Sequence, residues 1–256
     1  MHTEMVDRKP ITTIRPESKR KLQYVIEKLG AHTQTPKLGR WQTLSNDELW
    51  RHIVSQVCVM GSAIRMERLE REGRSLAFDA ALSLSTLSAK QDRVEYIAGQ
   101  LHDFDVTRFY NKAAHRLETA LGDPNIVRDS RVVLLENIPA GEPDDVREAL
   151  LARSPSLFLR KSVSDLMITL GLSHDVIALD QRVVGLLNTH LGYNRTFDRL
   201  QASRALYLSV EDCLRDVSKE AGVSLGTLDR MLFKFAGLTA IEYLMGIDLP
   251  KAAAGS

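Results

Sequence analysis

The sequence predicts an all-α fold, because its apolar residues recur at helical spacing and helix start and stop signals bound the segments that contain them. Leu22, Val25, Ile26 and Leu29 show the spacing that gathers side chains on one face of a helix. No segment shows the sustained alternation of apolar and polar residues that marks a half-buried strand. At 256 residues the chain is long enough to bury a substantial core, as one large domain or as two small ones that share a cleft.

The first two expected helices have recognisable start signals. Pro16 begins the first helix, since proline is favoured in a first turn, and Gly30 ends it. A polar loop over residues 31–44 follows. Ser45 and Glu48 then have the spacing of a capping box, which predicts a long second helix. The apolar stripe of this second helix comprises Leu49, Ile53, Val57, Met60 and Ile64.

Further helices are expected through the middle of the chain. Asp105 is a suitable N-cap for a helix that Gly122 ends. Pro124 and Pro143 each stand where a first helical turn would begin, so each predicts a helix, the first of them over residues 126–138.

The last third of the chain contains two helices separated by a short connection. A break at residues 154–156 precedes a helix that contains Lys161 and ends at Gly171. Asp180 begins the next helix, and three more helical stretches extend to about Met245.

We therefore divide the chain into four segments. Residues 1–44 form an N-terminal helix and loop that pack on the core, and residues 45–139 form a helical lobe. Residues 140–245 form a second lobe with the helices around Lys161 and the closing helices. Residues 246–256 form a flexible tail, because their composition offers no apolar face to bury.

The charge composition gives an ambiguous indication of the binding partner. The formal net charge of +1 counts mildly against a nucleic-acid-binding protein, because phosphate neutralisation supplies most non-specific affinity. Two basic clusters offset this argument, and each of them is equally well explained as a solvated surface. They consist of Lys19, Arg20 and Lys21, and of Arg182, Arg195, Arg199 and Arg204.

Several classes of protein are excluded by composition. Cys58 and Cys213 are the only cysteines, too few for a disulfide framework or a four-cysteine iron–sulfur loop. The His-Asp pairs at His102 and His174 offer too few ligands, so we expect no metal site. No stretch approaches the length of a membrane span, and residues 1–10 lack the apolar region of a signal peptide. We therefore expect an intracellular protein without membrane contact.

Lys161 and Asp180 are the most informative pair of residues in the chain. They lie 19 positions apart (180 − 161), and the tight connection around Gly171 can turn the second helix back so that both polar ends face one cleft. An amine attacks a carbon atom only when it is uncharged, so a lysine among apolar neighbours suits imine chemistry. We predict that Lys161 is a nucleophile and Asp180 its carboxylate partner, with simple helix capping as the alternative role of Asp180.

This pair and its flanking residues resemble the helix-hairpin-helix DNA glycosylase superfamily, and within it the bifunctional 8-oxoguanine glycosylase/lyases. The resemblance covers the middle and C-terminal thirds of the chain and is carried by Lys161 and by residues 178–183, which read Ala-Leu-Asp-Gln-Arg-Val. It implies a two-lobed helical fold with a central cleft, no cofactor, and double-stranded DNA containing a damaged base as the partner of a monomer. It also implies that Lys161 forms a Schiff base and drives β-elimination, while Asp180 stabilises the sugar cation.

The resemblance implies further site residues, beginning with those that contact DNA and those that stack on an extruded base. Contacts with DNA are expected from Arg160, Arg182, Gln56 and Ser162. Trp50, Phe158 and Phe233 are candidates for stacking on the base, although core packing is the favoured role of each ring.

The hairpin before the lysine departs from the family pattern. Family members carry Gly-x-Gly there, whereas this chain has Leu157 and Leu159. The departure removes the residues that most easily adopt positive φ and let backbone N–H groups approach a phosphate.

Two other functions remain open. Residues 216–230 resemble the helix-turn-helix of bacterial repressors, with Gly222 in the turn and Ser224 capping the recognition helix, which would make the protein a non-catalytic DNA-binding regulator. We favour a packed helix pair there, because residues 231–235 are too apolar to face a DNA groove. The second alternative is a glycosylase of the same fold that lacks lyase activity and excises an alkylated base.

Overall fold

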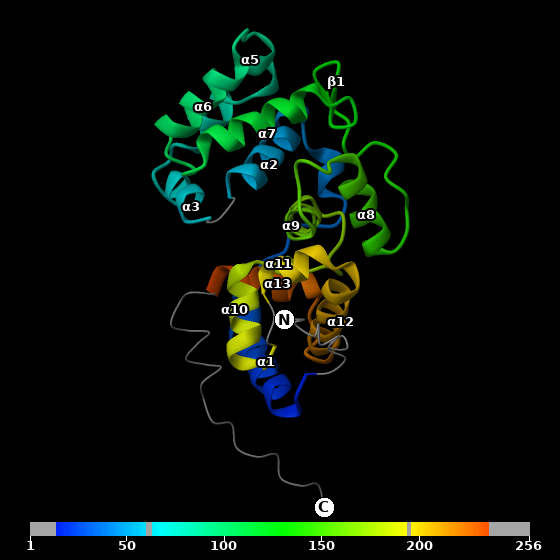
Figure 1. Ribbon diagram of the computed structural model, residues 1–256. Helices are drawn as coiled ribbons and strands as arrows, with labels where there is room; N and C mark the ends of the chain where they lie inside the picture. The colour runs from blue at the N-terminus through cyan, green and yellow to red at the C-terminus, as the bar shows by residue number, and fades with distance from the viewer. Residues whose placement is uncertain (1–13, 60–62, 194–195, 236–256) are drawn as a thin grey trace, which may run out of the picture. The chain divides into compact units, whose positions relative to one another are not determined.

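The computed structural model describes residues 14–59, 63–193 and 196–235, whose regular secondary structure is helical apart from one two-stranded hairpin (Figure 1). The all-α prediction is confirmed. The chain divides into two compact units. Unit 1 contains the described residues of 1–36 and 173–256, and unit 2 contains those of 37–172.

Unit 2 is built from short helices and one small antiparallel hairpin. Its elements are η2 (Arg40–Thr43), α2 (Asn46–Cys58), α3 (Ile64–Arg71), α4 (Ser75–Ala81), α5 (Leu84–Ser88), α6 (Arg93–Asp103), α7 (Tyr110–Gly122), β1 (Val127–Arg128), β2 (Arg131–Val132), α8 (Pro143–Arg153) and α9 (Arg160–Leu170).

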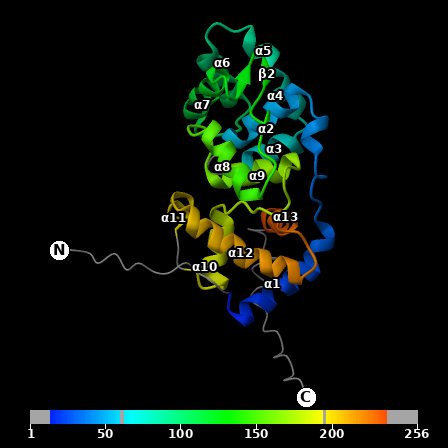
Figure 2. The same cartoon turned by 90° about the vertical axis from the view of Figure 1, so that its right-hand side faces the viewer.

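Helix α2 is the central helix of unit 2, because it contacts α5, α7, α9 and β2 (Figure 2). Its apolar side is fully buried through Trp50, Ile53, Val54 and Val57. Each such side chain contributes roughly 1.5–3 kcal/mol to the free energy of unfolding. Helix α9, which carries Lys161, packs against both α2 and α8, so the core of unit 2 places this lysine.

Unit 1 combines the N-terminal helix with the C-terminal helices. Its elements are α1 (Pro16–Leu29), η1 (Gly30–His32), α10 (Gln181–His190), α11 (Phe197–Ala202), α12 (Arg204–Glu220) and α13 (Leu225–Phe235). Helix α1 packs against α12 and α13, which follow it in the sequence by more than 170 residues. A single apolar cluster joins these helices, with Leu22, Val25, Tyr207 and Leu228 completely buried in it.

The divisions between the units differ from the expected segment boundaries. We expected the second lobe to begin at residue 140, whereas the chain passes between units at 36/37 and at 172/173. Helices α8 and α9 belong with α2 because α9 packs on α2 and α8 packs on α9.

Three predicted helix starts are confirmed. Pro16 opens α1 and Pro143 opens α8. The Ser45 hydroxyl accepts a hydrogen bond from the Glu48 N–H at 3.3 Å, and the Glu48 carboxylate accepts one from the Ser45 N–H at 2.8 Å, which is the reciprocal capping box.

The expected continuous helix from Ser45 to Ile64 is wrong. Helix α2 ends at Cys58 and a separate helix, α3, begins at Ile64, whose side chain is 65% exposed. Met60 of the predicted stripe lies outside the described residues. The intervening sequence contains Gly61 and Ser62, which have low helix propensity.

The expected helix over residues 126–138 is also wrong. The segment forms the β1–β2 hairpin, in which Val127 pairs with Val132. Asp129 and Ser130 at its turn both have positive φ (51° and 57°), the geometry that matches the twist of a two-residue hairpin. The Asp-Ser turn signal therefore outweighs the helix-starting tendency of Pro124.

Asp105 does not cap a helix. It adopts a left-handed conformation (φ 49°), and its carboxylate forms ion pairs with Arg65 and Arg68 of α3. Helix α7 begins later, at Tyr110, and ends at Gly122 as expected. The two guanidinium groups bind the Asp105 carboxylate, so it does not accept hydrogen bonds from the N–H groups of a helix start.

Gly171 ends α9 in the left-handed conformation, with φ +68°. Its carbonyl oxygen accepts a hydrogen bond from the Gly39 N–H at 2.8 Å. A Cβ at Gly171 would lie 3.2 Å from the Arg40 nitrogen and 3.0 Å from the Lys37 carbonyl carbon, with the Lys37 oxygen closer still. Only glycine fits between these two backbone segments of unit 2.

We predict that Gly171→Ala strongly destabilises the protein. The left-handed conformation costs an alanine roughly 1–2 kcal/mol. The contact with the Lys37 backbone adds about 1–3 kcal/mol, as in an overpacked core. Chemical denaturation monitored by circular dichroism measures the loss in the free energy of unfolding.

Gly73→Ala is the matched control. Gly73 also lies in unit 2 with φ +69°, but a Cβ there would meet no atom within 4 Å. We expect only the conformational cost for this variant. Equal losses for the two variants would contradict the role of the Gly171 backbone contact.

Candidate active site

Lys161 lies in the first turn of α9, and its side chain is half-buried. The opposite side of α9 is anchored in the core through Val163, Leu166 and Met167, which are fully buried. Asp165 lies one helical turn after Lys161 and therefore on the same side of the helix. This arrangement fixes the backbone of the predicted nucleophile and leaves its amine on the polar side of α9.

Asp165 connects this side of α9 to α2. The side-chain amide of Gln56, which is 8% exposed, donates a hydrogen bond to the Asp165 carboxylate. The structure thus gives Gln56 a role in the α2–α9 contact, and its DNA contact stays a prediction. Asp165 was not among the predicted site residues, although the spacing of four residues between Lys161 and Asp165 indicates that they share a helix face.

The residues that flank Lys161 have their own partners. The guanidinium of Arg160 forms an ion pair with Glu148 of α8 at 3.0 Å. Ser162 is half-buried on α9. In the hairpin before them, Leu157 is buried, whereas Leu159 is 52% exposed in an extended conformation with negative φ (−103°). The DNA contacts of Arg160 and Ser162 stay predictions.

Asp180 is the N-cap of α10, as predicted. Its Oδ1 accepts hydrogen bonds from the N–H groups of Arg182 and Val183, each at 2.9 Å. Its Oδ2 accepts from the Arg182 Nε at 3.3 Å. These bonds fix the orientation of the carboxylate at the N-terminus of α10. Capping and a role as a fixed anion are therefore compatible in one residue.

Arg182 links Asp180 to an aromatic ring. Its guanidinium carbon lies 4.2 Å from the centroid of the Phe233 ring on α13, a cation–π contact. Phe233 is half-buried and lines a pocket of about 440 Å³ in unit 1 together with His32, Arg230 and Lys234. Polar and cationic groups therefore surround one accessible aromatic side chain.

The other two predicted stacking residues are core side chains. Trp50 is 1% exposed, and its indole N–H donates to the Leu82 carbonyl oxygen at 2.8 Å. Phe158 is 4% exposed. Both rings pack in the apolar interior of unit 2, which is the role that the sequence favoured for them.

The segment that resembles a helix-turn-helix is a packed helix pair. Gly222 has φ +72° in its turn, and the Ser224 hydroxyl accepts from the Thr227 N–H at 3.0 Å. The Thr227 hydroxyl in turn lies 3.0 Å from that of Thr35. Helix α13 is apolar on its packed face, where Leu225, Leu228, Met231 and Leu232 are buried. This packing agrees with the favoured reading of the segment as a packed helix pair.

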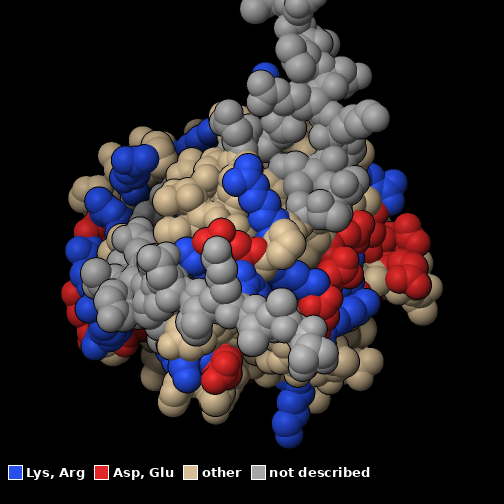
Figure 3. Space-filling view, turned by 90° about the horizontal axis from the view of Figure 1, so that it is seen from below, with Lys and Arg blue, Asp and Glu red and all other residues tan. Residues whose placement is uncertain are grey.

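The basic cluster at the start of α1 is largely paired with acids. Lys19 forms an ion pair with Glu220, and Lys21 lies 3.7 Å from Glu17. Basic and acidic side chains are interspersed over the face of the molecule in Figure 3. This cluster therefore behaves as a solvated, charge-balanced surface.

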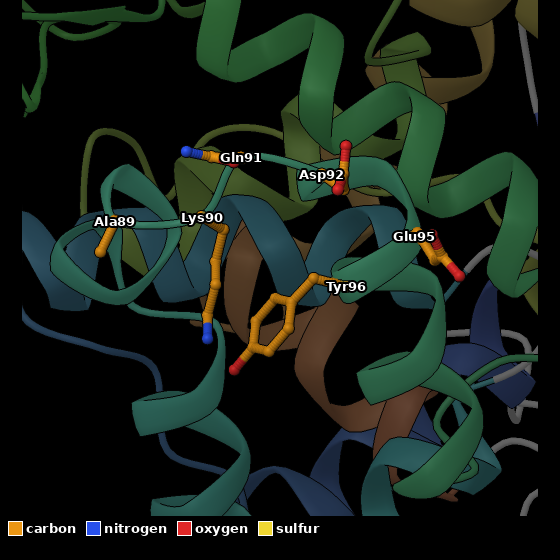
Figure 4. A pocket seen from close by; sticks show the side chains of 6 residues that line it. All are labelled: Ala89, Lys90, Gln91, Asp92, Glu95 and Tyr96. Carbon is orange, nitrogen blue, oxygen red and sulfur yellow. The ribbon is translucent and has the colours of Figure 1, made fainter.

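A shallow surface pocket of about 410 Å³ lies in unit 2 at the start of α6 (Figure 4). Lys90 and Tyr96 point toward each other there, with the ammonium 4.3 Å from the ring centroid. None of the predicted site residues lines this pocket. We assign it no role in the site.

The buried thiol of Cys58 is unreactive near neutral pH. Burial raises the pKa of Cys58 to about 12, so its thiol does not ionise near neutral pH. Among residues 14–59, 63–193 and 196–235, no three His, Cys, Asp or Glu side chains gather as metal ligands. Within the same ranges, no helix has both the length and the apolar character needed to cross a membrane.

No family model and no curated protein matches the sequence. Solved structures do share its fold. The 8-oxoguanine glycosylase/lyase of Methanocaldococcus jannaschii, in complex with DNA that contains 8-oxoguanine, aligns with a TM-score of 0.60 and 19% identity, over 86% of this chain and 96% of that chain. The 8-oxoguanine DNA glycosylase of Thermotoga maritima aligns with a TM-score of 0.56 and 21% identity, over 86% and 95%. The predicted glycosylase-like fold is thereby confirmed.

We predict that His52 on α2 makes stability fall in mild acid. Burial is the main cause that lowers its pKa from 6.5 to about 4, with added repulsion from Arg51 and Arg40 that outweighs the attraction of Glu48 and Asp165. Between pH 6.5 and pH 4, His52 is therefore protonated in the unfolded chain and neutral in the folded chain. The free energy of unfolding should fall by roughly 2–3 kcal/mol between pH 6.5 and pH 4 from this residue.

Urea denaturation across this pH range checks the prediction. His52→Gln should flatten the dependence, whereas the same change at His115, which is exposed, should not. An unchanged slope in His52→Gln would show that other groups cause the acid sensitivity.

Proposed function

We propose that this protein is a DNA glycosylase with associated abasic-site lyase activity. The substrate class is an oxidised purine in double-stranded DNA, with 8-oxoguanine as the first candidate. The observation that carries the proposal is the coincidence of two independent results. The fold is that of 8-oxoguanine glycosylases, and an α9 lysine and an α10 N-cap aspartate stand in this chain at the positions that the sequence motif predicts.

In the proposed reaction, Lys161 attacks the damaged nucleotide. Its uncharged Nζ bonds to C1′ of the deoxyribose while the bond from C1′ to the base breaks, and the base leaves with the electron pair and takes up a proton. Opening of the C1′–O4′ bond then gives an imine between Nζ and C1′. Removal of a C2′ proton expels the 3′ phosphate, so the strand is cut by β-elimination.

Asp180 acts in the first step as a fixed anion. Departure of the base leaves positive charge on the sugar, which a carboxylate held in place stabilises without reorganisation. The capping bonds from the N–H groups of Arg182 and Val183 hold Oδ1, and the Arg182 Nε contacts Oδ2.

Phe233 is the residue that we propose for stacking on the extruded base. It is half-buried beside a pocket of unit 1, and one of its neighbours, Arg182, belongs to the same helix start as Asp180. Base–aromatic stacking is tolerant of base identity, so Phe233 supplies affinity and the polar pocket residues supply selection. A panel of duplexes with oxidised and alkylated bases distinguishes the leading substrate class from the alternative.

We predict that borohydride traps a covalent adduct between the protein and a duplex that contains 8-oxoguanine or an abasic site. The imine is the only intermediate in the scheme that borohydride reduces, so Lys161→Ala should abolish the adduct. Gel electrophoresis of labelled DNA measures the trapped fraction. Lys112→Ala, which changes an exposed lysine of α7, should trap as well as wild type. An undiminished adduct in Lys161→Ala would refute the assignment.

A second prediction separates the chemistry of Asp180 from its capping. Asn is as good an N-cap as Asp, so Asp180→Asn should keep its free energy of unfolding within about 0.5 kcal/mol of wild type, whereas Asp180→Ala should lose about 1 kcal/mol. Loss of the charge should slow single-turnover base release by about 10²–10³-fold in both variants. Wild-type rates in Asp180→Asn would leave Asp180 with capping alone.

A further inference from the structure

The extended segment 177–179, which leads directly into Asp180, poses a physical problem. Ile177 and Leu179 are fully buried and Ala178 is 6% exposed, yet the segment belongs to no helix or strand. Buried N–H and C=O groups are costly unless they are hydrogen-bonded. The backbone of this segment must therefore find partners outside regular secondary structure.

Two side chains satisfy part of this backbone. The Tyr207 hydroxyl of α12 donates to the Ile177 carbonyl oxygen at 2.6 Å and accepts from the Leu179 N–H at 3.2 Å. The Gln201 amide of α11 donates to the Leu179 carbonyl oxygen at 3.3 Å. The tyrosine therefore bridges both ends of the segment with one atom.

Two carboxylates complete the set. Glu211 of α12 accepts from the Ile177 N–H at 2.9 Å, and Asp229 of α13 accepts from the Ala178 N–H at 2.7 Å. The Ala178 carbonyl oxygen accepts from the Asp180 N–H, also at 2.7 Å. Each N–H and C=O of the segment thus has a partner, and the last of these bonds holds Asp180 itself.

The polar side chains that bind this segment lie in the apolar core of unit 1. Tyr207 and Glu211 are 0% exposed and Asp229 is 3% exposed, within an apolar cluster of unit 1. Polar groups in such surroundings are retained only with their hydrogen bonds made. The segment cannot shift along its axis or twist without breaking several of these bonds together.

We propose that Tyr207, supported by Glu211 and Asp229, positions Asp180 for base excision. The proposal rests on the function proposed above. A carboxylate that stabilises charge must stay in place to within about 1 Å, and an error of that size lowers a rate by about 10²-fold. Tyr207 acts through the backbone of residues 177–180, so it is a positioning residue that does not touch the DNA.

The test compares two buried tyrosines of the same core. Tyr207→Phe removes only the bridging hydroxyl, whereas Tyr193→Phe removes the hydroxyl of a residue that is 3% exposed and has no hydrogen bond to the segment in the described structure. The measurements are the single-turnover rate of 8-oxoguanine release and the Kd for the same duplex. We expect a rate loss of about 10–100-fold in Tyr207→Phe with Kd changed less than about twofold, and no rate loss in Tyr193→Phe.

A double-variant comparison tests whether Tyr207 works through the carboxylate. In an Asp180→Asn background, Tyr207→Phe should cause little further loss, because the group that it positions is already gone. An equal further loss in that background would overturn the proposal. So would a Tyr207→Phe rate within about twofold of wild type, or a loss that appears only as weaker DNA binding.

The rate of base release in Gln201→Met and amide hydrogen exchange in the tyrosine variants provide two further tests. Gln201→Met removes another donor to the segment with little change in shape, and should slow base release in the same direction if Tyr207→Phe does not fold. Amide hydrogen exchange at Leu179 and Asp180 should accelerate in Tyr207→Phe but not in Tyr193→Phe, whatever the DNA substrate. Absence of base release by the wild-type protein would refute the proposed function, whereas unchanged exchange would refute the positioning role.

Discussion

The need to hydrogen-bond the backbone of one buried extended segment organises unit 1. Residues 177–179 have no neighbouring strand, so side chains of α11, α12 and α13 must reach in from the apolar core to satisfy them. This requirement explains why a tyrosine, a glutamine and two carboxylates are buried among aliphatic side chains. It also delivers Asp180 to the start of α10 with a fixed backbone, so the stability of the core and the placement of the carboxylate depend on the same bonds.

In unit 2 the corresponding constraint is close backbone packing. Gly171 ends α9 by turning left-handed against the Lys37–Arg40 backbone, a position that has no space for a Cβ. Helix α2 then holds α9 from another side, through apolar packing and through the bond from Gln56 to Asp165. The predicted nucleophile therefore stands on a helix whose end and face are both fixed, which suits chemistry that needs accurate placement.

Local signals in the sequence were reliable where one residue type decides the conformation. Pro16, Ser45 and Pro143 start helices, and Gly171 ends one, because each signal depends on a side-chain acceptor or a φ value that few residues provide. The signals failed where a competing partner lay far away in the sequence. Asp105 pairs with arginines of α3 instead of capping a helix, and the hairpin over residues 127–132, which its Asp-Ser turn favours, packs against α2 through β2.

The sequence by itself determined the helical class, several helix ends, and the placement of Lys161 in a helix and Asp180 at an N-cap. These depend on interactions within a few residues. Only the tertiary structure decided that Gln56 is an interior residue and that Tyr207, Glu211 and Asp229 hold the segment before Asp180. The reason is that burial and hydrogen bonding between distant segments depend on which helix faces meet, and a periodic pattern shows that a face is apolar without showing what will cover it.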